Sequence, residues 1–372
     1  MNKKEYCILD EICSYVNNRT SNVDYYISTE NMLPNKGGVC EAANVPSGTV
    51  TEYKVGDILI SNIRPYFQKI WRADRNGGCS ADVLCIRAKE NVDSKYLYYL
   101  LSQQVFFDYV MSGAKGCKMP RGDKKQIMQW PVTLPPLEEQ RRIAGILGSL
   151  DDKIELNRRI NANLEAQAQA LFRSWFVDND NQLDNYQTKS LTDIAQYLNG
   201  LAMQKFPPES IQNSLPVLKI KELGQGLCDA SSDRCSTSIK PEYIINDGDV
   251  IFSWSGTLLV DVWCGGKCGL NQHLFKVTSD NYPKWFIFYW TKHHLDKFIR
   301  IAKDKAVTMG HIKRCDLESS EVKVPEKPIL EYLDKIFTPL FDSMITHRIE
   351  NRKLSALRDT LLPKLMAGEI SC

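Results

Sequence analysis

The sequence predicts an α+β fold: two mixed α/β domains, related by a pseudo-two-fold axis and separated by an antiparallel pair of long coiled-coil helices. Two observations lead to this prediction. Residues 134–177 and 328–366 carry apolar residues at helical spacing, and an internal repeat places one globular segment before each of them. The length of 372 residues suits two or three domains. We therefore expect a tandem duplication of one unit, a globular domain followed by a long helix.

The first long segment, residues 134–177, starts with features that favour a helix N-terminus. Pro135 and Pro136 mark a turn, and Glu138 and Glu139 suit the positive end of the helix dipole. Apolar residues then recur at alternating spacings of three and four, a heptad seam that needs a partner helix. At 1.5 Å per residue the helix would be about 60 Å long. We expect it to act as a spacer rather than as the core of one domain.

The second long segment, residues 328–366, carries the same seam and supplies that partner. Gly148 and Pro339 occupy equivalent positions and both weaken helices, so a kink or restart is expected there. Gly368 is placed to cap the second helix. The duplication favours antiparallel pairing, with the two domains at opposite ends.

Both seams are polar in the middle. A buried polar layer costs stability and fixes the register of paired helices. The alternative is that these positions face solvent because the bundle is short or splayed. The predicted seam residues are Leu150, Ile154, Asn157, Asn161, Leu164 and Leu171 in the first helix, and Leu340, His347, Asn351, Leu354 and Leu361 in the second.

The internal repeat has an offset of about 190 residues. Residues 56–61 (GDILIS) match residues 248–253 (GDVIFS), and each is a turn dipeptide that leads into an apolar strand. Aromatic-rich segments with helical spacing also recur, and their rings are expected to form the core. The further predicted elements are strands at 82–87 and 273–277 and helical segments at 94–110 and 283–301.

A basic, polar loop is predicted before the last strand of each domain, at residues 113–126 and 302–314. Two similar readers held apart by a rod suit two sites on duplex DNA, about 12–18 base pairs apart for a rod of roughly 40–60 Å. Lys and Arg would hold phosphates, while Asn, Gln, His and Arg have the donors and acceptors that read bases. Any one of them alone is more often a solvated surface group. The candidate DNA-binding residues are Asn62, Arg64, Asn76, Lys118, Arg121, Lys124, Lys125, Asn271, Gln272, Lys303, Lys305, His311, Lys313 and Arg314.

Several other classes of protein lack support in the sequence. There is no phosphate-binding GxxxxGK[ST] loop, no NPPY or DPPY methylation motif, no GxSxG and no HExxH. No run of about 18 apolar residues predicts a membrane span, and the N-terminus does not resemble a signal peptide. The twelve cysteines form no CxxC pair, and Cys264 with Cys268 comes closest to ligand spacing. We expect reduced thiols in a cytoplasmic protein, with no metal site and no catalytic residues.

Residues 134–176 (LPPLEEQRRIAGILGSLDDKIELNRRINANLEAQAQALFRSWF) resemble the central conserved region of the specificity subunit of type I restriction–modification systems. GDILIS and GDVIFS resemble the strand motif of its target-recognition domains, and residues 357–370 (LRDTLLPKLMAGEI) resemble its distal conserved region. The chain departs from the pattern at residues 325–328, where PEKP stands in place of PPLEEQ. The resemblance covers the whole chain. It divides the chain into recognition domains at 1–133 and 181–325 and conserved helical regions at 134–180 and 326–372.

This resemblance implies a non-catalytic reader of double-stranded DNA that binds no cofactor and no membrane. Each recognition domain would read one half of a bipartite, asymmetric site, and the helix pair would set the spacer. The helical regions would recruit two adenine-N6 methyltransferase subunits that use S-adenosylmethionine. Two restriction subunits that use ATP and Mg²⁺ would complete a type I endonuclease.

Three alternatives remain open. A coiled-coil scaffold without DNA would explain the helices but not the basic loop that recurs in both units. An enzyme with a site between the repeats would be active as an isolated chain. A DNA reader could also serve a different methyltransferase. Neighbouring genes for a methyltransferase and a helicase-like nuclease would separate these readings.

Overall fold

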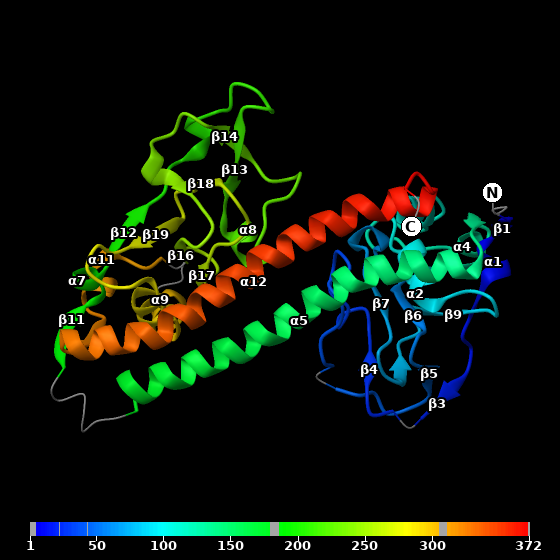
Figure 1. Cartoon of the computed structure of the whole chain (residues 1–372), viewed down its shortest axis with the longest axis horizontal. Helices are drawn as coiled ribbons and strands as arrows, with labels where there is room; N and C mark the ends of the chain where they lie inside the picture. Colours follow the sequence, from blue (N-terminus) through cyan, green and yellow to red (C-terminus); the bar gives the residue numbers. More distant parts are fainter. Residues whose placement is uncertain (1–4, 22, 43, 179–185, 305–310, 371–372) are drawn as a thin grey trace. The chain divides into compact units, whose positions relative to one another are not determined.

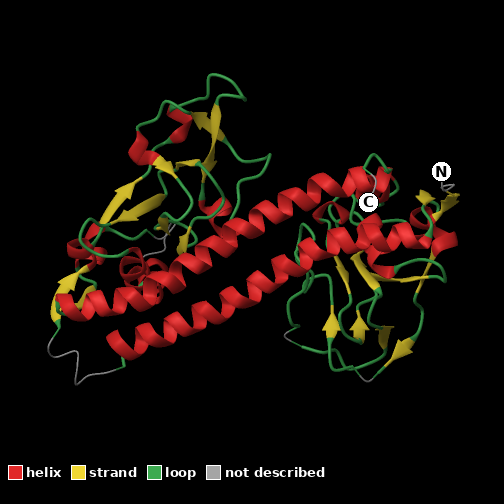
Figure 2. Cartoon of the chain, viewed as in Figure 1, coloured by secondary structure: helices red, strands yellow, loops and turns green. Residues whose placement is uncertain are grey.

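The computed structural model describes residues 5–21, 23–42, 44–178, 186–304 and 311–370, and it divides into two compact units (Figures 1 and 2). Unit 1 contains Met1–Asp152 and Leu354–Cys372, and unit 2 contains Lys153–Lys353. Two long helices, α5 (Leu137–Phe176) and α12 (Lys327–Ala367), each contribute one segment to each unit.

Unit 1 holds a two-stranded sheet and two four-stranded sheets. The strand orders are β1-β10, β2-β9-β6-β7 and β3-β5-β8-β4. Its elements before α5 are β1 (Glu5–Ile8), α1 (Leu9–Ile12), β2 (Cys13–Tyr15), β3 (Arg19–Thr20), β4 (Tyr26–Ile27), β5 (Val50–Tyr53), β6 (Ile58–Ser61), η1 (Pro65–Phe67), β7 (Ile70–Arg72), β8 (Gly77–Cys79), β9 (Val83–Ala88), α2 (Ser94–Leu101), α3 (Gln104–Ser112), α4 (Lys124–Met128) and β10 (Pro131–Leu134).

Unit 2 has the same kinds of sheet, with strand orders β11-β20, β12-β19-β16-β17 and β14-β13-β18-β15. Its elements before α12 are β11 (Gln187–Ser190), α7 (Leu191–Ile194), β12 (Gln196–Asn199), η2 (Met203–Lys205), β13 (Ser214–Leu218), α8 (Ile220–Gln225), β14 (Arg234–Ser236), η3 (Pro241–Tyr243), β15 (Ile244–Ile245), β16 (Val250–Ser253), β17 (Leu259–Val262), β18 (Cys268–Leu270), β19 (Leu274–Thr278), α9 (Lys284–His293), α10 (Leu295–Asp304), α11 (Arg314–Glu318) and β20 (Glu321–Val324).

The sheet topology confirms the predicted duplication. The sheet β2-β9-β6-β7 corresponds strand for strand to β12-β19-β16-β17, and the pair β1-β10 corresponds to β11-β20. The third sheets share one parallel and one antiparallel pairing around β8 and β18. They differ at the edge, because β3 pairs with β5 in unit 1 whereas β14 pairs with β13 in unit 2. The repeat is therefore conserved in the sheets that carry the GDxxxS motifs.

The Gly-Asp dipeptide of each motif builds a tight turn. Gly56 and Gly248 have φ angles of 91° and 87°, which favour glycine. The Asp57 carboxylate accepts from the Lys54 N–H at 2.7 Å and pairs with Arg87 on β9 at 2.7 Å. The equivalent carboxylate, Asp249, accepts from the Asn246 N–H at 2.9 Å and pairs with Lys276 at 2.9 Å. Each Asp therefore closes the turn and also holds the neighbouring strand.

The serine of each motif fixes the loop that follows the strand. Ser61 Oγ donates to the Ile63 carbonyl at 2.9 Å, and Ser253 Oγ donates to the Thr257 carbonyl at 2.7 Å. Both serines are buried, so the hydrogen bonds satisfy hydroxyls that have left water. The motif is thus a scaffold that positions a loop at the carboxyl end of β6 or β16.

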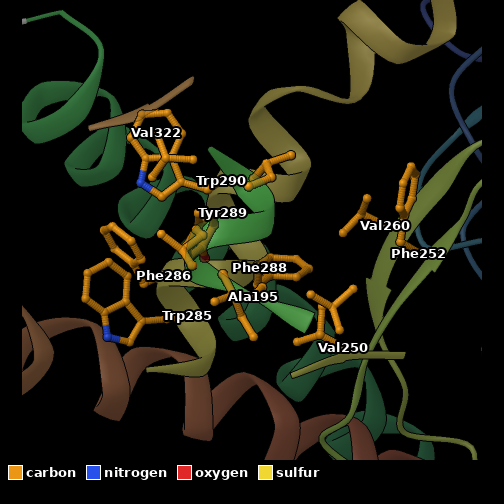
Figure 3. Packing of buried hydrophobic residues seen from close by; sticks show 14 of the residues in the cluster. Ala195, Val250, Phe252, Val260, Trp285, Phe286, Phe288, Tyr289, Trp290 and Val322 are labelled. Atoms are coloured by element: carbon orange, nitrogen blue, oxygen red, sulfur yellow. The ribbon is translucent and has the colours of Figure 1, made fainter. Parts of the chain in front are cut away.

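The aromatic helices form cores, as the sequence predicts. In unit 2, every residue from Trp285 to Trp290 on α9 is buried. Figure 3 labels the aromatic side chains of this segment together with Val250 and Val322 of the same cluster. The Trp285 ring stacks on Phe337 of α12, with centroids 4.2 Å apart. Such ring pairs add stability beyond the area they bury.

Each predicted aromatic helix is in fact two helices. The segment predicted at 94–110 breaks between α2 and α3, where Gln103 is extended (φ −71°, ψ 146°). The segment predicted at 283–301 is interrupted at His294, a turn residue with φ −81° and ψ −3° between α9 and α10. The break lets two short helices cover one core. Leu100 and Phe106 on either side of the first break lie in the same hydrophobic cluster.

The predicted basic loops also contain helical structure. In unit 1, Asp123 caps α4 by accepting from the Lys125 N–H at 2.9 Å, so the end of the loop is a helical turn. In unit 2, α10 extends to Asp304 and α11 starts at Arg314. Residues 305–310, which include the predicted Lys305, lie outside the described residues.

Both long helices have their ends in hydrophobic cores, so each of them is also part of the two units. In unit 1, Ile143 and Leu147 of α5 and Leu365 of α12 belong to the cluster that contains α2. In unit 2, Phe172 of α5 and Phe337 of α12 belong to the cluster that contains α9. Both helices therefore contribute side chains to the hydrophobic core of each unit.

Neither helix restarts at its weak residue. The helices α5 and α12 are continuous through Gly148 and Pro339. A Cβ on Gly148 would lie 2.2 Å from Lys95 Nζ, so the glycine makes room for that side chain. Gly368 has a φ of 73° and its N–H donates to the Leu365 carbonyl at 3.1 Å, which is the predicted C-terminal cap.

The polar residues in the middle of the two helices face each other within unit 2. Asn157 is fully buried, and its amide donates to Glu350 Oε2 at 2.7 Å and Asn351 Oδ1 at 2.9 Å. Asn161 donates to the Met344 carbonyl at 3.0 Å and bonds to His347 Nδ1 at 2.9 Å. The alternative of a solvent-facing layer does not describe Asn157. Of the apolar seam residues, Ile154 is buried, and the following are half-buried: Leu150, Leu164, Leu171, Leu340, Leu354 and Leu361.

Candidate nucleic-acid interface

Three loops of unit 1 meet at the carboxyl end of β6, and we call this place junction 1. The Arg64 N–H donates to the Pro120 carbonyl at 2.8 Å. The Lys36 N–H donates to the Gln68 carbonyl at 3.0 Å. These backbone bonds give the junction a defined shape. Its loops are residues 33–38, 61–69 and 115–122.

Junction 1 gathers four of the predicted residues of unit 1. Arg121 is exposed and pairs with Asp82 at 3.2 Å, and Lys118 is also exposed. Arg64 is half-buried, and its Nε has no hydrogen-bond partner among the described residues. Asn62 is only 8% exposed, and its Oδ1 is likewise unpartnered. The two arginines and Lys118 therefore form the cationic part of the junction, while Asn62 lies beneath it.

The other predicted residues of unit 1 lie outside junction 1. Asn76 sits near the opposite end of β6, where its Oδ1 accepts from the Val55 N–H at 3.0 Å. That bond gives Asn76 a structural task in the turn before the GD motif. Lys124 and Lys125 are exposed in the first turn of α4. The Lys115 ammonium, together with backbone N–H groups, holds the pKa of the capping Asp123 carboxyl below its usual range.

An equivalent junction lies at the carboxyl end of β16 in unit 2, and we call it junction 2. The Ile312 N–H donates to the Trp254 carbonyl at 3.1 Å, and His311 pairs with Ser255 in an isolated bridge. The corresponding bridge in junction 1 joins Ile63 and Arg121. Junction 2 therefore repeats the antiparallel bridge between the motif loop and the basic loop that junction 1 has. It consists of residues 253–258, 271–273 and 311–313.

The side chains at junction 2 are aromatic and heterocyclic. The Trp254 ring lies 5.5 Å from His311 and 6.1 Å from His273, measured between centroids. Gln272 Nε2 lies 3.3 Å from His273 Nε2. Asn271 is 7% exposed, and its Oδ1 accepts from the His273 N–H at 3.3 Å, so it supports the loop from below. Gln272, His273 and His311 therefore carry the polar groups of this junction.

A groove of about 590 Å³ opens beside junction 2. Gln272 and His273 line it together with three cationic side chains, Lys219, Lys221 and Arg234. Lys219 and Asp233 form an ion pair on its wall. The groove thus combines hydrogen-bonding side chains with cationic ones, a composition that suits a nucleic-acid surface.

The remaining predicted residues of unit 2 are exposed. Lys303 lies on α10, and Lys313 precedes α11 and donates its N–H to Asp316 at 2.8 Å. Arg314 pairs with Glu318 at 3.3 Å in an exposed i,i+4 pair. Ion pairs of this kind contribute little to stability, so Arg314 remains available to a stronger anionic partner.

Sequence reasoning missed several residues at the junctions, among them Trp254, His273, Tyr66 and Phe67. Trp254 directly follows Ser253 of the second GDxxxS motif, and Tyr66 and Phe67 come shortly after Ser61 of the first. Their position shortly after the motif was therefore the sequence signal that could have identified them. Charge directed attention to the basic loop of each junction, and donor and acceptor groups pointed to Asn62 and Arg64 but not to the rings beside them.

Among the described residues, no three or more His, Cys, Asp or Glu side chains are grouped to hold a metal ion. Cys264 and Cys268 are both buried, and burial raises the pKa of the Cys264 thiol to about 11. Within the described part of the chain, no helix is both long and apolar enough to cross a membrane.

Two α+β units with matched loop junctions define a tandem recognition protein. The chain belongs to the family described as type I restriction modification DNA specificity domain, whose model matches residues 8–166 and 184–354, one match in each repeat. The resemblance found in the sequence is thereby confirmed.

Known relatives agree with this family. The chain is 28% identical to the type I restriction enzyme MjaIX specificity subunit of Methanocaldococcus jannaschii, over 76% of this chain and 70% of that one. It is 23% identical to the HindI specificity subunit of Haemophilus influenzae, over 93% of this chain and 94% of that one. The crystal structure of a type I restriction–modification S subunit from M. genitalium has the same fold, with a TM-score of 0.59 and 14% identity over 98% of this chain and 96% of that one.

Proposed function

We propose that this chain is the DNA-specificity subunit of a type I restriction–modification complex, and that each unit reads one half of a bipartite site. The observation that carries the proposal is the pair of junctions at the ends of β6 and β16. They have the same backbone arrangement in the two repeats of a DNA-specificity family.

The two half-sites should differ in sequence. Junction 1 offers guanidinium groups, Arg64 and Arg121, whose fork of donors suits guanine O6 and N7. Junction 2 offers imidazole and amide groups from His273, His311 and Gln272. Similar frames with different side chains would give one protein two specificities, so we propose an asymmetric site. The exposed lysines Lys118, Lys124, Lys125, Lys303 and Lys313, with Arg314, would bind phosphates.

We further propose that α5 and α12 form an antiparallel pair that sets the spacer between the half-sites. Within unit 1, Asp151 of α5 pairs with Arg358 of α12 at 2.7 Å. Within unit 2, Asn157 bonds to Asn351 and Asn161 bonds to Met344. The partners descend along α12 as the residues ascend along α5, which supports antiparallel pairing. The recognition domains would then be residues 1–133 and 181–325, with helical regions 134–180 and 326–372.

The chain itself would be non-catalytic and cytoplasmic. Its partners would be double-stranded DNA, two methyltransferase subunits that bring S-adenosylmethionine, and two restriction subunits that bring ATP and Mg²⁺. The polar outer faces of α5 and α12 are the surfaces we assign to the methyltransferase subunits. This assembly follows from the family rather than from any contact within the chain.

Methylome sequencing tests the proposal directly. A host that expresses this chain with its methyltransferase should carry one methylated-adenine motif in two parts, and that motif should vanish when this chain is deleted. Replacing residues 1–133 with those of a relative should change one half-site only. If deletion removes no bipartite motif, the proposal is wrong and a scaffold without DNA becomes the better account.

A further inference from the structure

Junction 1 has exposed apolar side chains beside its cationic ones. Five large hydrophobic side chains around it are between 38% and 59% exposed: Leu33, Tyr66, Phe67, Val105 and Met119. Their backbones belong to elements that contact one another, because η1 packs on α3 and two loops hydrogen-bond to the η1 loop. Exposed apolar side chains gathered in this way mark a binding surface.

Two aromatic rings lie together within this surface. Tyr66 and Phe67 form the three-residue helix η1 with Pro65, and their ring centroids are 4.7 Å apart. Lys69 Nζ lies 6.0 Å from the centre of the Phe67 ring. We call this partly exposed pair of rings, which has a cation beside it, the aromatic projection.

The loops that hold this projection are strained. Of the five non-glycine residues with positive φ in the described part of the chain, four lie in junction 1: Asn35, Lys36, Arg64 and Gln68. Arg64 and Gln68, both at φ 51°, stand at the two ends of η1. The backbone bond from Asn35 to Phe67, 2.8 Å long, ties the strained loops together. Strain of this kind is held by surrounding structure and is concentrated at functional sites.

The charge around the projection suits a polyanion. Arg64 and Lys69 flank η1, Lys118 adjoins the exposed Met119, and Arg121 lies on the adjoining hairpin. A protein partner bound through the aromatic side chains alone would not need these cationic side chains. Duplex DNA needs both, because apolar wedges unstack base steps while cations hold the neighbouring phosphates.

We propose that Tyr66 and Phe67 form a wedge that enters the half-site read by unit 1 and unstacks one base step. The step should be a pyrimidine–purine step, because these are the easiest to unstack. The inference rests on the proposed DNA-reading function and deepens it. Junction 2 would read its half-site differently, because the Trp254 ring is half-buried and stacked on Phe275 at 5.6 Å.

The test uses the complex of the full chain with its methyltransferase and a duplex that carries the motif found in the methylome. 2-Aminopurine replaces one base at a time in the half-site of unit 1. The wild-type complex should raise the fluorescence several-fold at one step, because unstacking relieves quenching. The Tyr66→Ala/Phe67→Ala variant should lose that rise and bind on the order of 10- to 100-fold more weakly. Tyr66→Phe should keep both, because the ring remains.

Two further variants separate a wedge from general damage. Tyr6→Ala removes an aromatic side chain that is 87% exposed on β1 of the same unit, and it should change neither fluorescence nor affinity. Tyr66→Leu/Phe67→Leu keeps apolar bulk without rings, so it should fold like the wild type, keep only part of the fluorescence rise and bind more weakly, because the stacking of bases on the rings is lost.

The outcomes are distinguishable from failure of the proposed function. If the wild-type chain directs no bipartite methylation, the function fails and the wedge fails with it. If the motif exists but both double variants bind and unstack it as the wild type does, the wedge alone is wrong. If the double variants lose the methyltransferase subunit on co-purification while the wild type retains it, the surface binds protein, and the wedge is again wrong.

Discussion

Asn157 and Asn351 are joined side chain to side chain inside unit 2, where the Asn157 amide donates to Asn351 Oδ1 at 2.9 Å. Asn157 is fully buried, and its own Oδ1 has no partner among the described residues. Replacing Asn351 with Leu leaves the buried amide with one acceptor fewer. We expect Asn351→Leu to lower the free energy of unfolding by about 1–3 kcal/mol.

The double variant Asn157→Leu/Asn351→Leu should recover that loss, because both polar groups are removed together. Urea unfolding followed by tryptophan fluorescence measures both effects. Asn163→Leu, on the exposed face of α5, is the matched control and should stay within about 0.5 kcal/mol of wild type. Equal effects of Asn351→Leu and Asn163→Leu would show that the polar layer does not stabilise the helices.

Asp151 and Asp152 are adjacent on α5 but should differ in their contribution to stability. Asp151 is 26% exposed, pairs with Arg358 at 2.7 Å and accepts from Tyr99 Oη at 2.6 Å. Asp152 is 75% exposed and meets Lys95 at 3.2 Å. Asp151→Ala should cost about 1–3 kcal/mol, since Arg358 keeps only its more exposed partner Asp359 and the Tyr99 hydroxyl loses its acceptor. Asp152→Ala should cost at most about 0.5 kcal/mol. Thermal unfolding of the two variants would contradict this account if their midpoints fell equally.

The stability of unit 2 should fall in mild acid because of His294. Burial lowers the pKa of His294 from 6.5 to about 4, and its Nε2 donates to the Glu321 carbonyl at 2.8 Å. The unfolded chain takes up a proton near pH 6.5 while the folded chain does not, so stability is complete above about 6.5 and is lost as pH falls toward 4. The neighbouring His293 acts in the same direction, because burial lowers its pKa too.

The variant His294→Gln keeps a donor for Glu321 but cannot titrate. Its melting temperature should fall less than that of the wild type between pH 7 and pH 5. His311→Gln, at an exposed position in the same unit, is the control and should follow the wild-type curve. A His294→Gln curve parallel to the wild type would rule out His294 as the source of the acid sensitivity.

Arg121 should contribute to DNA affinity through phosphate contacts. It is exposed at junction 1, and its ion pair with Asp82 at 3.2 Å is weak enough to exchange. Arg121→Gln should weaken binding of the complex and reduce the slope of log affinity against log salt by about one. Arg75→Gln, an exposed arginine paired with Asp74 at 2.7 Å, is the control. An unchanged salt slope in Arg121→Gln would remove this residue from the interface.

Much of the fold follows from local sequence. The GDxxxS motifs specify turns and buried strands. In each turn the glycine, Gly56 or Gly248, adopts a positive φ, and the aspartate, Asp57 or Asp249, accepts a hydrogen bond that closes the turn. The long helices follow from periodicity. The breaks at Gln103 and His294 do not, because continuous apolar spacing hides a turn that only the shape of the core requires.

The candidate interface was predictable only in part. Charge pointed to Arg121 and donor–acceptor groups pointed to His311, and their loops do meet the loops that follow the motif strands. Residue type could not show that Asn62 and Asn271 are buried, since both are polar and lie in loops. Asn76 was also grouped with residues that lie at the other end of β6. Which loops meet at a strand end is decided by sheet topology, and a single sequence does not display it.

The central claim is that two readers share one site whose spacer is set by α5 and α12. The most direct measurement is the methylome of a host in which seven residues of matching heptad are inserted after Asp152 in α5 and before Leu354 in α12, where the chain passes between the units. Seven helical residues add about 10 Å, or about three base pairs. The account predicts a longer spacer with both half-sites unchanged. A motif with altered half-site bases, or with the original spacer, would contradict it.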